Sequence, residues 1–99
     1  MFDCTGWIVQ ATAGRDKDEL FFVVGVDEEK ERLLLANGKR RKAANPKAKQ
    51  SGHVQPVDPE DFDHPVIRKL QQHTPVSDRE LRMALAAFKG GNHAWQKTI

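Results

Sequence analysis

The sequence predicts a small domain that is mainly β-sheet, with five short strands closed into a barrel and one or two short C-terminal helices packed on it. Three observations lead to this fold class. Residues 1–57 alternate strand-forming runs with turn signals. Residues 58–99 contain a helix with a capping box and an apolar stripe. A chain of 99 residues suits one structural domain, and barrel closure removes sheet edges that so short a chain cannot cover.

The first strands are predicted from apolar and β-branched runs. Residues 6–13 are rich in β-forming residues, and residues 20–26 form a continuous apolar run that suits a strand buried on both faces. Arg32–Ala36 is the third predicted strand. Asn37-Gly38 is a signal for a type I′ hairpin turn, so residues 39–43 are expected to return as a fourth, antiparallel strand.

A two-residue turn would fix the register of this hairpin. Ala36 would face Lys39, and Leu33 would face Lys42. Four consecutive basic residues would then point alternately to both sides of the sheet. The fourth strand is therefore expected to be short, to lie at an edge, or to cover leucines with its aliphatic stems while its charges reach water.

The rest of the barrel is predicted from the residues after this strand. Pro46 ends the strand because proline cannot donate a hydrogen bond to the ladder. Residues 47–52 are expected to form a polar loop, and residues 53–57 a closing fifth strand. Three aromatic residues in the strand patterns are expected in the core: Trp7, Phe21 and Phe22.

An acidic turn and a helical extension follow. Residues 58–65 contain two prolines and four acidic residues, and residues 66–72 suit about two helical turns. Ser77 and Glu80 form a capping box that begins a second helix, which Gly90-Gly91 is expected to end. Its apolar positions recur at helical spacing and are interpreted as core, rather than a partner groove, because so small a barrel needs a cover: Leu81, Ala84, Leu85 and Phe88.

The charge distribution is strongly segregated. Residues 39–49 hold six of the sixteen basic residues, and no Asp or Glu occurs between Arg32 and Val57. The net charge is only +2, so the acidic residues are concentrated in other segments. Such a run is either a nucleic-acid-binding surface or a solvated face.

Several other functional classes are not indicated by the sequence. One cysteine, Cys4, excludes an internal disulfide and a cysteine-based zinc site, and it is interpreted as a small hydrophobic residue. The four histidines have no metal-ligand spacing, and the acidic residues from Asp58 to Asp63 lack the EF-hand pattern. No nucleophile–base arrangement or phosphate-cradling glycine loop is present. We therefore expect no enzyme activity, cofactor, metal or small-molecule substrate.

The expected location is the cytoplasm. The longest apolar run, residues 20–26, is far shorter than the roughly 20 residues that a membrane-spanning helix needs. The first residues do not combine a basic region with an apolar stretch, so no signal peptide is expected.

The residues from Ala13 to Lys17, followed by the apolar run from Leu20, resemble the KOW motif of certain ribosomal proteins and transcription elongation factors. More closely, the chain resembles the short bacterial KOW-domain RNA-binding proteins, which are akin to a large-subunit ribosomal protein of archaea and eukaryotes. The resemblance covers roughly residues 5–90 and departs at Asp18, where the family often has glycine. The matching segments are Gly14–Lys17, Ala36-Asn37-Gly38, residues 39–42, residues 46–49 and His53.

This resemblance implies an SH3-like barrel of the KOW type and RNA binding. We expect a non-catalytic protein that contacts structured ribosomal RNA, or a ribosome-related particle, mainly through the RNA backbone. Arg40 and Arg41 are candidates for bidentate phosphate contacts, and His53 is either an RNA contact or an ordinary strand residue. The alternative is an SH3-like protein-interaction module with a ribosomal or transcription protein as partner. The candidate RNA-binding residues are Arg15, Lys17, Lys39, Arg40, Arg41, Lys42, Lys47, Lys49 and His53.

Overall fold

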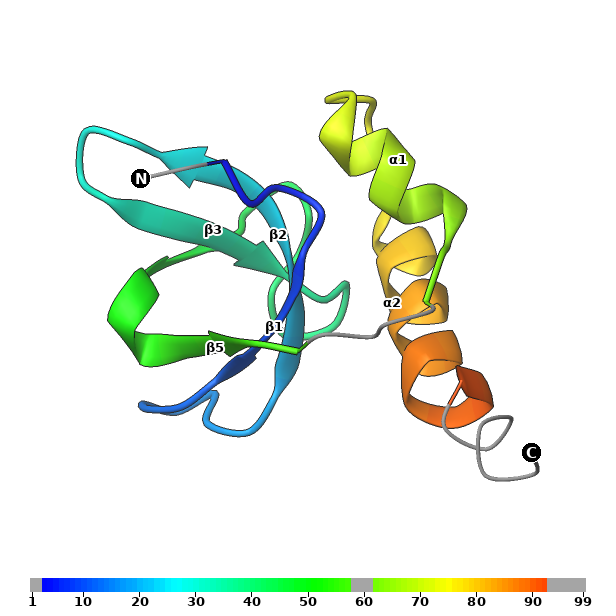
Figure 1. Ribbon diagram of the computed structural model, residues 1–99, viewed down its shortest axis with the longest axis horizontal. Coiled ribbons are helices and arrows are strands. Elements are labelled where there is room, and N and C mark those ends of the chain that lie inside the picture. The colour runs from blue at the N-terminus through cyan, green and yellow to red at the C-terminus, as the bar shows by residue number, and fades with distance from the viewer. Residues whose placement is uncertain (1–2, 58–61, 93–99) are drawn as a thin grey trace.

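The computed structural model describes residues 3–57 and 62–92 and shows a mainly β fold with short helices against one side of a sheet (Figure 1). The sheet has five antiparallel strands in the order β4-β3-β2-β1-β5. The fold class is thus confirmed in outline. The elements are β1 (Ile8–Ala11), β2 (Leu20–Asp27), β3 (Arg32–Ala36), β4 (Lys47–Gln50), a 3₁₀ turn (Ser51–His53), β5 (Val54–Pro56), α1 (Pro65–Gln71), α2 (Asp78–Ala86) and a π-helical turn (Ala87–Asn92).

The sheet is strongly curled but open. β4 and β5 lie at opposite edges of the sheet, yet only Ser51–His53 connects them. Three residues span at most about 11 Å, so the two edges must approach each other. No ladder joins β4 to β5 among the described residues, and the closed barrel expected from the sequence is therefore not established.

β2 is buried on both faces, as its continuous apolar sequence predicts. Phe21 and Val23 pack with Leu35 in a cluster on the face of the sheet away from the helices. Phe22 points to the other face and packs in a second cluster with residues of α1 and α2. Burying one such phenylalanine contributes about 2–3 kcal/mol, so β2 is the element around which both clusters form.

The two helices begin as the sequence predicts. The Ser77 side chain accepts a hydrogen bond from the Glu80 backbone N–H, and the Glu80 carboxylate accepts one from the Ser77 N–H, both at 3.1 Å. Proline opens α1, where His64 Nδ1 accepts a hydrogen bond from the Val66 N–H at 3.2 Å. The expected end of the second helix is wrong: α2 ends at Ala86 and continues as a π-helical turn through the glycine pair.

The apolar stripe of α2 is core, as expected. Its residues pack against the sheet in the same cluster as Ile8 and Phe22. The sheet of the protein therefore covers the apolar stripe of α2. The buried residues of the stripe are Leu81, Ala84, Leu85 and Phe88.

The predicted fourth strand is wrong. Residues 39–43 form a loop, and β3 pairs with β4 instead, with Leu35 opposite Lys47 and Leu33 opposite Lys49. The reason lies at Asn37, whose side-chain oxygen accepts hydrogen bonds from the backbone N–H groups of Lys39 and Arg41 and so stabilises a wide loop in place of a tight turn. The expected polar loop at residues 47–52 is consequently β4 and the 3₁₀ turn, while the fifth strand is confirmed as β5.

Burial of the remaining candidates is mixed. Phe21 and Phe22 are buried as expected, but Trp7 is 39% exposed and is not a core residue, because it precedes β1. Cys4 is buried, and this burial raises the pKa of its thiol. The acidic residues 58–61 and the segment 93–99 lie outside the described residues.

Candidate nucleic-acid interface

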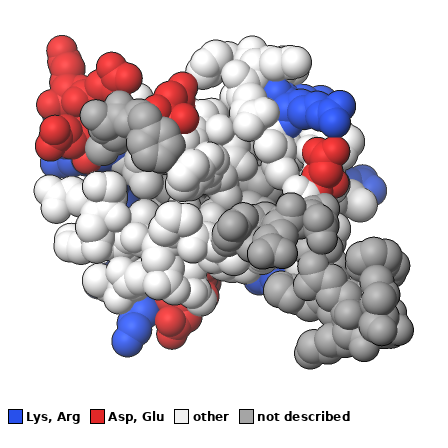
Figure 2. All heavy atoms as spheres, in the orientation of Figure 1, with Lys and Arg blue, Asp and Glu red and all other residues white. Residues whose placement is uncertain are grey.

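The order of the strands separates acidic from basic side chains. The β2–β3 turn carries the acidic residues 27–31 at one end of the sheet, and the β1–β2 and β3–β4 loops lie at the other end. The eight residues of β2 span about 25 Å between the two ends. Figure 2 shows acidic atoms gathered at the upper left, where Figure 1 places the β2–β3 turn, and smaller basic and acidic groups at the right and at the bottom of this face. The acids of this turn therefore lie far from the β1–β2 and β3–β4 loops, whereas Arg32, the first residue of β3, lies opposite Asp27 in the sheet.

The β1–β2 loop, residues 12–19, has a fixed backbone. Ala11 and Asp18 are joined by a hydrogen bond of 2.8 Å, and the Ala11 N–H donates to the Glu19 carbonyl at 3.0 Å. Gly14 has φ +83° and Asp18 has φ +74°, both in the left-handed region. Asp18 thus adopts a backbone conformation that favours glycine.

The β3–β4 loop, residues 37–46 and here called the basic loop, is held against α2. The Asp78 carboxylate accepts a hydrogen bond from the Ala43 N–H at 2.7 Å. The Arg82 guanidinium donates to the Gly38 carbonyl at 2.7 Å. Gly38 itself is at φ +78°, and a Cβ added there would lie 2.2 Å from the Asp78 carbonyl oxygen. The helix therefore positions the basic loop.

Asp16 joins the two loops. Its carboxylate is 2% exposed. Oδ2 accepts a hydrogen bond from Arg41 Nε at 3.0 Å and forms an ion pair with Arg41 Nη2 at 2.8 Å. Arg40 Nη1 lies 3.9 Å from Asp16 Oδ1 and 3.7 Å from Glu19 Oε1. Arg41 therefore uses Nε and Nη2 to hold the loops together, and this edge of its guanidinium is not available for the bidentate phosphate contact expected from the sequence.

Beside this ion pair lies a cleft of about 500 Å³, here called the basic cleft. The β1–β2 loop, β3, the basic loop, β4 and the 3₁₀ turn all contribute to it. Lys49 Nζ donates a hydrogen bond to the Ala13 carbonyl at 3.0 Å, which ties β4 to the β1–β2 loop. The charged and histidine side chains that line the cleft are Arg15, Asp16, Arg32, Arg41, Lys47, Lys49 and His53.

The other candidate residues lie outside this cleft. Lys39 and Arg40 line a second hollow of about 410 Å³ against α2, together with Arg82 and other residues. Lys17 and Lys42 are exposed, and neither lines the basic cleft or this second hollow. The structure thus brings Arg15, Arg41, Lys47, Lys49 and His53 together and separates them from the other four.

Three basic residues near these hollows were not among the sequence candidates. Arg32 lines the basic cleft, and Arg82 and Lys89 line the second hollow. Arg32 is the first residue of β3 and lies opposite Gln50 of β4 in the antiparallel sheet. Only this pairing of β3 with β4 shows that Arg32 lies near Lys47 and Lys49. For Arg82 and Lys89 the sequence has no signal, because their position depends on how α2 docks.

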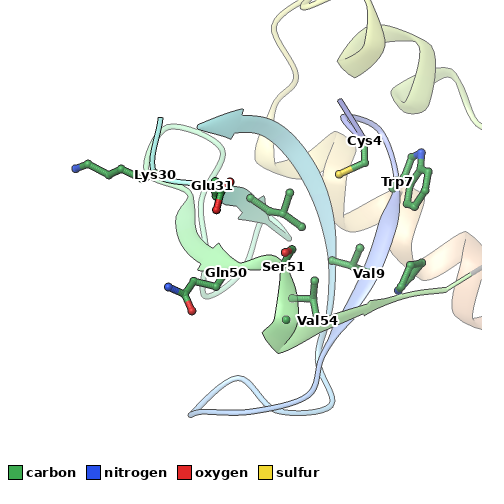
Figure 3. A pocket seen from close by; sticks show the side chains of 11 residues that line it. Cys4, Trp7, Val9, Lys30, Glu31, Gln50, Ser51 and Val54 are labelled. Atoms are coloured by element: carbon green, nitrogen blue, oxygen red, sulfur yellow. The ribbon is translucent and has the colours of Figure 1, made fainter. Parts of the chain in front are cut away.

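A third cleft, of about 640 Å³, is mainly apolar. Figure 3 shows Cys4, Trp7, Val9 and Val54 around it, from the N-terminal segment, β1 and β5. The half-exposed Trp7 indole is its largest aromatic surface.

The chemistry of the basic cleft is that of an anion-binding surface. Arg and Lys side chains supply cationic hydrogen-bond donors, and the one carboxylate among them is paired with Arg41. Among the described residues, no three His, Cys, Asp or Glu side chains are placed to hold a metal ion. Neither helix in the described ranges is long and apolar enough to cross a lipid bilayer.

No protein-family model matches the chain, and no curated protein matches it in sequence.

Proposed function

We propose that this protein is a non-catalytic RNA-binding protein that acts in the bacterial cytoplasm. Its basic cleft and the adjoining basic loop bind the phosphate backbone of structured RNA in a ribosome or a ribosome-related particle. The observation that supports this most is the convergence of five cationic side chains from four separate segments around one cleft. They are Arg15, Arg32, Arg41, Lys47 and Lys49.

The physical basis of the proposal is phosphate neutralisation. Cationic side chains held at fixed spacing displace counterions from an RNA backbone, and this release drives binding. Arg15, Arg32 and Lys47 are exposed, so their charged groups are accessible to a phosphate. Neither Phe nor Trp is among the described residues that line the cleft, and recognition is therefore led by the backbone and its shape more than by base stacking.

The proposed fold is an SH3-like barrel of the KOW type. Two features support it. β5 lies beside β1 while β4 lies at the far edge, and one short turn connects them, which is the arrangement of a sheet close to closure. The residues Gly14–Lys17 lie in the loop between the first two strands, where the strand–loop–strand motif requires them.

A salt titration tests the proposed function. If three to five phosphates are neutralised, the logarithm of the binding constant for structured ribosomal RNA falls with the logarithm of salt concentration at a slope of about −2 to −4. Fluorescence anisotropy with a labelled RNA measures the slope. Binding that does not change with salt, or no binding at low salt, would contradict the proposal. Crosslinking in cells followed by sequencing then identifies the RNA.

A protein-interaction module is the second candidate, and one observation favours it. The apolar cleft beside Trp7 offers a surface that an apolar peptide segment fits. The α2 stripe does not offer one, because it is buried. Loss of partner binding on Trp7→Ala, with RNA binding absent in the parent protein, would favour this candidate over the first.

A further inference from the structure

The second oxygen of the Asp16 carboxylate is buried without a hydrogen bond. Oδ2 is committed to Arg41, but Oδ1 has no hydrogen-bond partner among the described residues. Leaving a buried charged acceptor unpaired costs free energy, so this oxygen is a site at which a donor would be bound favourably. Asp16 also lines the basic cleft, which places the acceptor next to the proposed phosphate contacts.

Arg40 lies near this oxygen but does not hydrogen-bond to it. Its Nη1 lies 3.9 Å from Oδ1, beyond hydrogen-bonding distance. Its side chain is 58% exposed and divides its attraction between Asp16 and Glu19. An exposed ion pair of this kind is weak, so Arg40 can turn from Oδ1 to a phosphate at little cost, and the contact proposed next requires this movement.

Resting on the RNA-binding function proposed above, we propose that Asp16 Oδ1 accepts a hydrogen bond from a ribose 2′-hydroxyl and so makes the basic cleft selective for RNA over DNA. The 2′-hydroxyl is the group by which a protein distinguishes the two nucleic acids at a given site. It lies on the sugar between consecutive phosphates. A cleft whose described lining has several cations and one carboxylate therefore matches one ribose and its flanking phosphates.

The number of Asp16 carboxylate oxygens that are available favours a ribose 2′-hydroxyl over a nucleobase as the ligand. A guanine Watson–Crick edge presents two adjacent donors and would pair with both oxygens of a carboxylate. Asp16 has only one oxygen to offer, because Oδ2 accepts the hydrogen bond from Arg41 Nε and is ion-paired with Arg41 Nη2. A single hydroxyl donor is the better match.

The test compares one RNA hairpin with the same hairpin carrying 2′-fluoro groups, which retain the A-form sugar and the phosphate charge but lack the donor. The wild-type protein is expected to bind the fluoro hairpin about tenfold more weakly, as the loss of a hydrogen bond to a charged group implies. In Asp16→Ala, which leaves no hydrogen-bonding group at this position, the two affinities are expected to agree within about twofold. In the control, Glu19→Gln, which alters the neighbouring carboxylate, the tenfold preference remains.

The outcomes separate this inference from the proposed function. Equal wild-type affinity for the two hairpins overturns the 2′-hydroxyl contact and leaves RNA binding intact. A preference that persists in a folded Asp16→Ala protein also overturns it. No wild-type binding to either hairpin contradicts RNA binding itself, and the inference with it. If Asp16→Ala does not fold, the wild-type comparison of the two hairpins still decides the question.

Discussion

Asp16 Oδ2 accepts a hydrogen bond from Arg41 Nε at 3.0 Å and forms an ion pair with Arg41 Nη2 at 2.8 Å, across 25 residues of chain. The carboxylate is buried and the guanidinium is partly exposed, with 2% and 29% of their side-chain surfaces accessible. The one acid in the basic cleft is thus a structural residue that joins two loops. The exposed cations Arg15, Arg32 and Lys47 are left to act on a ligand.

Removing the two partners of this pair should have unequal effects on stability. Arg41→Ala leaves the buried Asp16 carboxylate with only the exposed Arg40 guanidinium nearby and should lower the free energy of unfolding by about 3 kcal/mol. Asp16→Ala removes the buried charge and leaves a guanidinium that can turn to water, so it should cost only about 1 kcal/mol. Urea denaturation measures both values. Equal costs, or the reverse order, would show that the pair is not held as described.

Gly38 should be intolerant of a side chain. A Cβ at Gly38 would lie 2.2 Å from the Asp78 carbonyl oxygen, and its φ of +78° disfavours other residues. Gly38→Ala should therefore destabilise the protein by about 3 kcal/mol. The matched control is Gly52→Ala, where an added Cβ meets nothing within 4 Å and the change should stay within about 0.5 kcal/mol. Thermal denaturation of the two variants gives the comparison, and similar melting temperatures would contradict the packing of the basic loop on α2.

Much of the fold could be predicted because its signals are local. The apolar run of β2 and the Ser77–Glu80 capping box each depend on residues close in sequence, and both elements form where expected. The basic loop could not be predicted in this way. Asn37-Gly38 has the sequence of a tight hairpin, but the Asn37 side chain bonds to Lys39 and Arg41 and forms a wider loop. Asp78 and Arg82, 35 and 44 residues away from their partners Ala43 and Gly38, then hold this loop against α2.

The residues of the basic cleft were predicted only in part, because some of them have local sequence signals and others are brought in by long-range pairing. The run of basic residues in the sequence predicted Lys47 and Lys49 as candidates. The resemblance of residues 13–17 to the KOW motif added Arg15. The convergence of these residues depends on the pairing of β3 with β4, which the tight-turn signal misassigned, and Arg32 was missed with it. The role of Asp16 in joining the β1–β2 loop to the basic loop was also not predicted. An acidic residue between basic residues does not indicate from the sequence which residue it pairs with.

Asp18 provides a test of the β1–β2 loop backbone. Its φ of +74° costs about 1 kcal/mol for a residue with a Cβ and nothing for glycine. Asp18→Gly should therefore be more stable than Asp18→Ala by several tenths to about 1 kcal/mol, after the greater unfolded-state entropy of glycine is subtracted. Both variants remove the same carboxylate, so the difference isolates the backbone. Chemical denaturation measures it, and a more stable alanine variant would contradict the left-handed conformation.

Glu80 should make stability depend on pH in the acidic range. A hydrogen bond from Lys69 at 2.5 Å, together with bonds to Ser77, lowers the pKa of Glu80 from its ordinary value of 4.5. A lowered pKa in the folded state stabilises the fold above pH 4.5, and this contribution is lost as pH falls through the folded-state pKa. The stability advantage of the wild type over Glu80→Gln should accordingly be largest near neutral pH and shrink below pH 4.5. Denaturation curves at pH 3, 4 and 6 check this sign, and an advantage that grows on acidification would contradict it.

The most direct test of RNA binding by the basic cleft compares two double variants of equal charge. Arg15→Ala with Lys47→Ala removes two exposed cations that line the cleft, and Lys30→Ala with Arg68→Ala removes two exposed cations that do not. The first variant should bind structured ribosomal RNA about tenfold or more weakly at 0.1 M salt, with a salt slope shallower by about 2, while the second keeps nearly wild-type values. Equal losses in the two variants would show that net charge alone drives binding, and that the cleft is not the interface.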